Sequence, residues 1–124
     1  MTGLGLALVL AAAAVTAISN MLLRAGVLRA GGFGVSEAGL VADMLRLAGQ
    51  PLFVAGVVLY GSAALIWFRV LSTETLATSY VLLVSATFIL VSVGGVLVFR
   101  EPIGALKVAG MLVILAGIAL VARA

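Results

Sequence analysis

The chain has 124 residues, of which 65% are hydrophobic and 9% are charged, and a soluble domain of that length could not hide so much apolar surface. It has no Cys and no His, which removes disulfides, thiol catalysis and the usual zinc sites, so we expect neither an enzyme nor a bound metal or cofactor. The net charge is +3, but its basic residues are scattered singly, so their expected partner is an anionic lipid surface and not nucleic acid.

Four apolar stretches of about 20 residues dominate the chain, and at about 1.5 Å of rise per residue each can cross a hydrocarbon core of roughly 30 Å. They are residues 2–23, 51–71, 76–99 and 103–122. The sequence predicts an all-α membrane protein in which four transmembrane helices form one domain over residues 1–124, with consecutive spans as antiparallel neighbours. Every charged residue lies outside these spans or close to their ends, so no carboxylate is left at mid-membrane.

The first span carries a polar stripe. Thr16 and Asn20 project within about 40° of each other on a helix, Ser19 lies on the other side of Thr16, and Arg24 continues toward the membrane surface. Polar side chains inside a membrane usually face the bundle interior or a wet cavity, so these four are candidate substrate contacts. A structural alternative has Asn20 bridging two helices. Part of the span resembles a signal-peptidase site, but its apolar run continues through Leu23, which favours a retained span.

The connection from residue 24 to residue 50 divides into a Gly-rich coil over residues 30–35 and a predicted helix over residues 36–48. Ser36 is the expected N-cap, with Glu37 in the first turn. Apolar residues fall on one face of this helix and charged residues elsewhere, which predicts a helix lying in the membrane interface. The alternative is a loop helix that packs on the protein itself. The apolar residues are Leu40, Val41, Met44, Leu45 and Ala48; Asp43 and Arg46 point elsewhere.

The other connections are short. Residues 72–74 are expected to supply an N-cap and an acidic first turn for the third span, and Pro102 is expected to start the fourth. Tyr60 and Tyr80 fall within the second and third spans and are further candidate substrate contacts, although each is equally suited to packing. Gly110 and Gly117 recur two turns apart in the fourth span, which favours an oligomer interface there over tight packing within a monomer.

The basic residues favour one orientation. Five of them lie on the side of the first and third connections and two on the opposite side, which predicts that both termini lie outside the cytoplasm. The bias is modest, and insertion in both orientations stays open. The five are Arg24, Arg29, Arg46, Arg100 and Lys107; the two are Arg69 and Arg123.

Four segments together carry a family resemblance: residues 64–71, 76–80, 99–103 and 110–117. In their order and spacing the chain resembles four-helix members of the drug/metabolite transporter superfamily. It looks most like EamA-type small proteins and flippase subunits for undecaprenyl-phosphate-linked aminoarabinose, with the small multidrug resistance transporters as more distant relatives. The resemblance implies a multi-pass protein of the bacterial inner membrane that assembles as a homodimer or with a related subunit.

The resemblance also assigns positions. Matching the end of the first span places Thr16 where the multidrug branch has its membrane-embedded Glu, Tyr80 on the substrate chamber, and Gly110 with Gly117 at the dimer contact. The chain departs from the family pattern at Thr75 and Ser79, so the family's substrate details do not carry over.

The missing carboxylate bears on mechanism, because a cation in a low-dielectric site needs a counter-charge and proton exchange needs a titratable group. We therefore expect a flippase that translocates a lipid-linked sugar or similar polar amphiphile across the bilayer without proton antiport. In it Arg24 would anchor a phosphate, Thr16, Ser19 and Asn20 would line the path, and Tyr80 would form a wall. The alternatives are efflux of small drugs or metabolites, and a non-transporting subunit of a larger complex.

Overall fold

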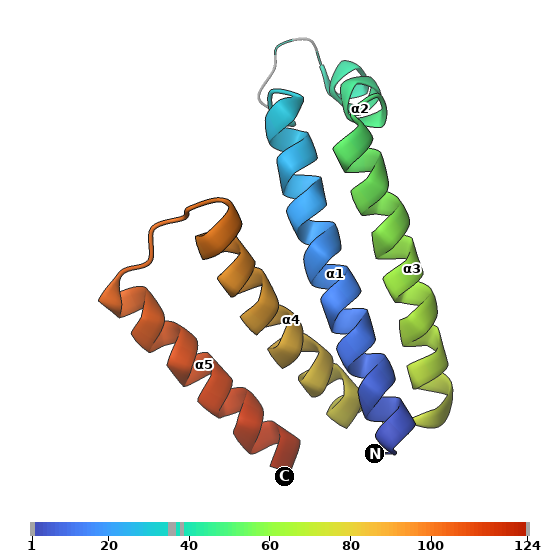
Figure 1. Cartoon of the computed structure of the whole chain (residues 1–124), viewed down its shortest axis with the longest axis vertical. Helices are drawn as coiled ribbons and strands as arrows, with labels where there is room; N and C mark the ends of the chain where they lie inside the picture. Colours follow the sequence, from blue (N-terminus) through green and yellow to red (C-terminus); the bar gives the residue numbers. More distant parts are fainter. Residues whose placement is uncertain (1, 35–36, 38, 124) are drawn as a thin grey trace.

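The computed structural model of the protein describes residues 2–34, 37 and 39–123, and these form five helices and no strand (Figure 1). The expectation of an all-α protein is confirmed. The helices are α1 (Gly3–Arg29), α2 (Leu40–Ala48), α3 (Pro51–Thr73), α4 (Leu76–Val98) and α5 (Ala105–Arg123).

Three of these helices, α1, α3 and α4, are long and apolar enough to cross a membrane. The protein is therefore a multi-pass membrane protein. The fourth expected span corresponds to α5, whose apolar part, Ala105–Val121, is shorter. α1 runs past its expected end at residue 23 because Arg24 is a good helix former, and it stops where Gly31 and Gly32 adopt positive φ angles of 89° and 96°.

α1 is the central helix of the molecule and lies between α3 and α4 (Figure 1). Chain direction alternates between successive long helices, so α1 and α4 run the same way and both ends of the chain lie at one end of the bundle. α3 and α4 contact each other very little, although they are consecutive. The expectation that consecutive spans are packed neighbours is thus wrong for this pair, because α1 takes the place between them.

Glycines set the close approach of α1 and α3. A Cβ atom on Gly26 would lie 2.5 Å from the backbone nitrogen of Phe53, and one on Gly56 would lie 3.0 Å from the backbone nitrogen of Leu23. Both distances are too short for a side chain, so the two backbones touch where only hydrogen atoms fit between them. The small-residue contact expected from the sequence lies in the last span, and the contact at Gly26 and Gly56 was not predicted.

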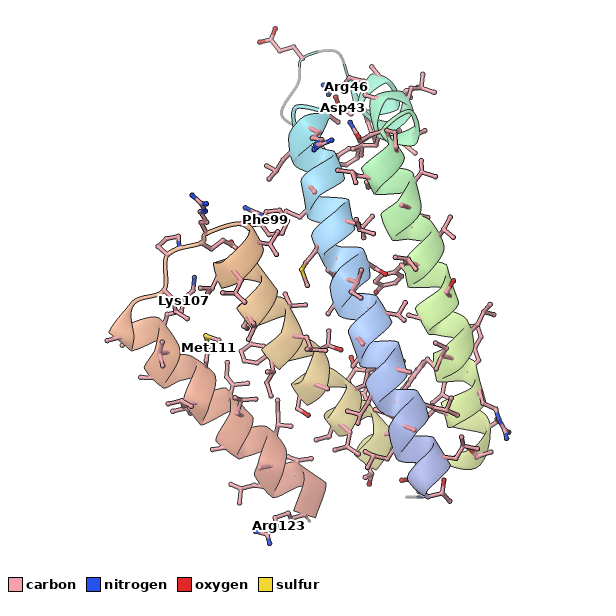
Figure 2. All side chains as sticks on the ribbon, viewed as in Figure 1. Asp43, Arg46, Phe99, Lys107, Met111 and Arg123 are labelled. Carbon is pink, nitrogen blue, oxygen red and sulfur yellow. The ribbon has the colours of Figure 1, made fainter. Side chains whose placement is uncertain are left out.

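α2 packs on the protein through Asp43 and Leu47 and turns most of its apolar residues away from it. Asp43 is buried, accepts a hydrogen bond of 3.0 Å from the Gly34 amide, and pairs with Arg46, which donates a 2.7 Å bond to the carbonyl of Ala30. The bonds tie the end of α1 to α2 (Figure 2). Leu40, Val41, Met44 and Leu45 are exposed, whereas Asp43 and Leu47 are buried against the protein. The interfacial helix and the loop helix that packs on the protein both stay predictions. Gly39 is the N-cap; the expected N-cap, Ser36, lies outside the described residues.

Both short connections differ from expectation. Thr75 is the N-cap of α4, whose first turn holds no acidic residue, while Glu74 ends α3 and reaches back to α1. The Thr2 hydroxyl and amide donate to Oε1 of Glu74 over 2.7 and 3.3 Å. At the other connection α4 ends at Val98 and α5 begins at Ala105, so Pro102 lies in the loop and does not start the helix.

The Glu74 contact predicts a pH dependence. The hydrogen bond from the Thr2 hydroxyl lowers the pKa of the Glu74 carboxyl below its ordinary value of 4.5. A lowered pKa stabilises the folded state at pH values above 4.5, and the contribution is lost as the pH falls through the lowered pKa. We expect a carboxyl-carbon NMR titration of Glu74 to give a midpoint below 4.5, and Thr2→Val to move it back toward 4.5. Equal midpoints in the two proteins would contradict the assignment.

α5 is attached to the rest of the protein mainly through α4. Its described side chains are exposed except for Met111, Leu115 and Ile118, which are half-buried on one face. A Cβ atom on Gly110 or Gly117 would meet nothing within 4 Å. Tight packing of these glycines within the monomer is therefore wrong, and the oligomer interface stays a prediction.

Candidate functional site

An open groove of about 620 Å³ lies at the middle of the bundle. Its floor comes from α1, and its two walls come from α3 and α4, which α1 holds apart. Tyr60 and Tyr80 line it and are nevertheless 51% and 55% exposed, so the groove opens sideways between α3 and α4. The lining residues are Ala12, Thr16, Tyr60, Ala63, Ala64, Trp67, Tyr80, Leu83, Val84, Thr87, Phe88, Val91 and Ser92.

The groove is polar in places but carries no charge in the part of the chain that the structure describes. Its polar groups are hydroxyls and an indole N–H, which come from all three helices. The Oγ1 atom of Thr87 is buried and has no hydrogen-bond partner among the described residues. Such groups can donate to and accept from a neutral polar ligand, but they give no counter-charge to an ion. The hydroxyls belong to Thr16, Tyr60, Tyr80, Thr87 and Ser92, and the indole belongs to Trp67.

Trp67 and Tyr80 form an aromatic pair across the groove. Their ring centroids are 6.2 Å apart and their planes are inclined at 61°, an edge-to-face arrangement. The pair joins α3 to α4 where the two helices otherwise touch little. Trp67 was not among the expected site residues, because a tryptophan near the end of a span is typical of the membrane interface. The signal that could have located it is its spacing of seven residues from Tyr60, which places both on one face of α3.

The structure brings together three of the six candidate substrate contacts, Thr16, Tyr60 and Tyr80. Ser19 is fully buried and donates a 2.7 Å hydrogen bond to the carbonyl of Val15. Asn20 donates a 3.1 Å bond to the carbonyl of Thr16, so it bonds its own helix and does not use that bond to bridge to another. Neither side chain lines the groove.

Arg24 lies outside the groove, beside the connection between α4 and α5. Its guanidinium carbon is 5.3 Å from the centre of the Phe99 ring, and its Nη2 atom is 3.9 Å from Oε2 of Glu101. Both charged side chains are about half exposed, so the ion pair adds little to stability. The contacts nevertheless hold Arg24 against this connection and away from the groove.

A smaller cavity of about 200 Å³ lies between α4, the following loop and α5. It shares Val91 and Ser92 with the groove, so the two spaces meet along α4. Its walls differ from those of the groove because they include the charged residues Glu101 and Lys107. Figure 2 shows Lys107 and Met111 on the side of α5 that is turned toward α4.

The four carboxylates of the chain all lie at helix ends or in connections: Glu37, Asp43, Glu74 and Glu101. No three potential metal ligands gather within the described residues. The groove therefore provides shape and neutral hydrogen bonding, and the charged groups stand outside it.

Comparison of the chain with protein-family models, with curated proteins and with solved structures finds no match in any of the three. The resemblance to four-helix drug/metabolite transporters therefore stays a hypothesis.

Proposed function

We propose that the protein is a membrane transporter, most specifically a flippase, that translocates a lipid-linked sugar or similar polar amphiphile without proton antiport. The observation that carries this proposal is the groove, which is open on its side, lies at the level of the membrane spans and is lined by neutral polar, aromatic and aliphatic groups. A substrate that is itself embedded in lipid can enter such a groove laterally. Its uncharged polar part finds hydroxyl partners there, and its chain stays in the bilayer.

The absence of charge in the described lining supports transport without protons. A titratable carboxylate in the groove would be required to exchange a proton for a substrate, and the carboxylates of this chain stand elsewhere. The driving force in this proposal is the gradient of the substrate itself.

The proposal includes a membrane arrangement. α5 completes a four-span protomer, and α2 lies in the membrane interface, where its exposed apolar face contacts lipid. The protein works in the bacterial inner membrane as a dimer whose contact includes Gly110 and Gly117, which are open on the surface of α5. Both termini face away from the cytoplasm.

A second candidate function is efflux of lipophilic cations. The aromatic rings of the groove favour it, because a cation can be held over a ring face without a carboxylate. The rings are those of Tyr60, Trp67, Tyr80 and Phe88.

Transport by the purified protein in liposomes distinguishes these functions. We expect a fluorescent polyprenyl-phosphate-linked sugar placed in one leaflet to reach the other leaflet without an imposed pH gradient, as measured by protection from a membrane-impermeant quencher. Protein-free liposomes are the control. A strict requirement for a pH gradient would contradict the mechanism, and uptake of a lipophilic cation with no movement of the lipid would favour the second candidate. Transport of neither compound would favour a non-transporting subunit.

A further inference from the structure

The smaller cavity beside the groove combines three properties that the groove lacks. It lies at the end of α4, it is bounded by a loop, and it holds fixed charges. Ser92 lies six residues before the end of α4 at Val98, or about 9 Å along the helix axis, while Lys107 is in the first turn of α5. The cavity thus extends from the interior toward the membrane surface, whereas the groove occupies the middle of the spans.

Lys107 is the cation that the protein leaves available at this cavity. Among the described residues no carboxylate oxygen lies within 4 Å of its amino group, although Glu101 lines the same cavity. The Glu101 carboxylate is directed toward Arg24 at 3.9 Å and packs over Gly95, where a Cβ atom would collide with its Oε1. Arg24 offsets part of the charge of Glu101 from outside the cavity, and Lys107 is the one cation among the described residues of the cavity wall.

We propose that this cavity binds the phosphate group of an amphiphile and that Lys107 is its cationic contact. The inference rests on the proposed function and sharpens it, because it assigns the two ends of the substrate to two connected spaces. The phosphate lies against Lys107 near the membrane surface, and the ligand continues past Val91 and Ser92 into the neutral groove. Lysine binds phosphate through charge-assisted hydrogen bonds of its ammonium group. This role was expected of Arg24, but Arg24 lines neither cavity and already contacts Glu101 and Phe99.

Trp67 makes the inference measurable, since it is the only tryptophan of the chain and lines the groove. Purified protein in detergent is titrated with two lipids that carry brominated acyl chains, which quench indole fluorescence on contact. One is a phosphatidic acid and the other is the corresponding diacylglycerol, which lacks the phosphate. We expect the phosphatidic acid to quench Trp67 at about tenfold lower concentration, the difference that one charge-assisted contact supplies.

Two substitutions that each remove one positive charge from α5 test whether Lys107 is the contact of the phosphate. Lys107→Gln should remove the preference for the phosphatidic acid and leave quenching by the diacylglycerol unchanged. Arg123→Gln, which makes the same charge change at the other end of α5, should preserve the preference (Figure 2). Glu101→Gln should increase it several-fold, because it frees Arg24 and removes an anion from the cavity wall. A preference that survives Lys107→Gln, or that falls equally in Arg123→Gln, would overturn the proposal.

A competition experiment distinguishes a lipid headgroup from a free phosphate ester as the ligand of the cavity. Inorganic phosphate and glycerol 1-phosphate are added at millimolar concentration to the protein with bound brominated phosphatidic acid. A cavity for a lipid headgroup should retain the lipid, because the acyl chains contribute binding in the groove, whereas recovery of Trp67 fluorescence would show a site for free phosphate esters and overturn the lipid assignment. Quenching by both lipids without any preference would contradict phosphate binding in the smaller cavity and would still agree with lipid binding in the groove. No quenching by either lipid would instead contradict the proposed function.

Discussion

Replacing Ala64 by tryptophan should block transport while leaving the protein folded. Ala64 lines the groove on α3, and an indole at this position occupies volume that a substrate needs. We expect the translocation rate in liposomes to fall by about tenfold or more, because the groove of about 620 Å³ is in the size range of ligand pockets and has little volume to spare for an amphiphile. Ala64→Leu, which adds a smaller side chain, should give an intermediate rate.

The neighbouring residue supplies the control for this experiment. Leu65 is 68% exposed and does not line the groove, so Leu65→Trp adds the same indole on the outside of α3. Its translocation rate should equal that of the unmodified protein. If both variants transport normally, the groove is not the path of the substrate. If both lose transport equally, the effect of Ala64→Trp is not specific to the groove.

Replacing Gly26 by leucine should destabilise the protomer strongly. The new Cβ atom would lie 2.5 Å from the backbone nitrogen and 2.8 Å from the Cα atom of Phe53, and a backbone cannot move aside as a flexible side chain can. α1 and α3 must separate, which disrupts the largest helix contact of the molecule. We expect a loss of about 3 kcal/mol in the free energy of unfolding, at the upper end of the usual cost of overpacking, and a lower melting temperature in detergent.

Glycine-to-leucine substitutions in α5 should instead change the oligomeric state and leave the stability of the protomer intact. In Gly110→Leu combined with Gly117→Leu, the new Cβ atoms meet nothing within 4 Å in the protomer, so we expect no loss in the melting temperature of the monomer. If α5 forms the dimer contact, the double variant should elute as a monomer under conditions in which the Gly26→Leu protein, where it folds, remains dimeric. A dimer that persists in the double variant would remove α5 from the interface.

The sequence predicted the three long apolar helices because span length and the position of charges follow from the bilayer alone, while the fourth span stays a prediction. The sequence also predicted the Gly-rich turn and the amphipathic face of α2, because both follow from the local order of residues. It did not identify α1 as the central helix, since the spans are apolar around most of their circumference and periodicity does not show which neighbour each face meets. Gly26 and Gly56 were missed because a glycine contact is defined only by the backbone of the other helix.

The groove was predicted in part. Thr16, Tyr60 and Tyr80 are conspicuous as polar groups in apolar spans, and all three line it. Ser19 and Asn20 are also polar groups in an apolar span, but they do not line the groove. Their side chains donate to backbone carbonyls of α1 instead. Trp67 was not predicted as a lining residue because its pairing with Tyr80 depends on the packing of α3 and α4 around α1.

The position of α1 has a consequence for how the protein is inserted into the membrane. The central helix is synthesised before α3 and α4, so it must reside in lipid before either of them exists to cover it. Two of its mid-span polar groups already have partners within the helix at that stage, because the Ser19 hydroxyl donates to the carbonyl of Val15 and one N–H of the Asn20 amide donates to the carbonyl of Thr16. A hydrogen bond made inside one helix removes much of the cost of exposing the group to hydrocarbon. α1 can therefore remain in the bilayer as a stable single span until α3 and α4 are inserted.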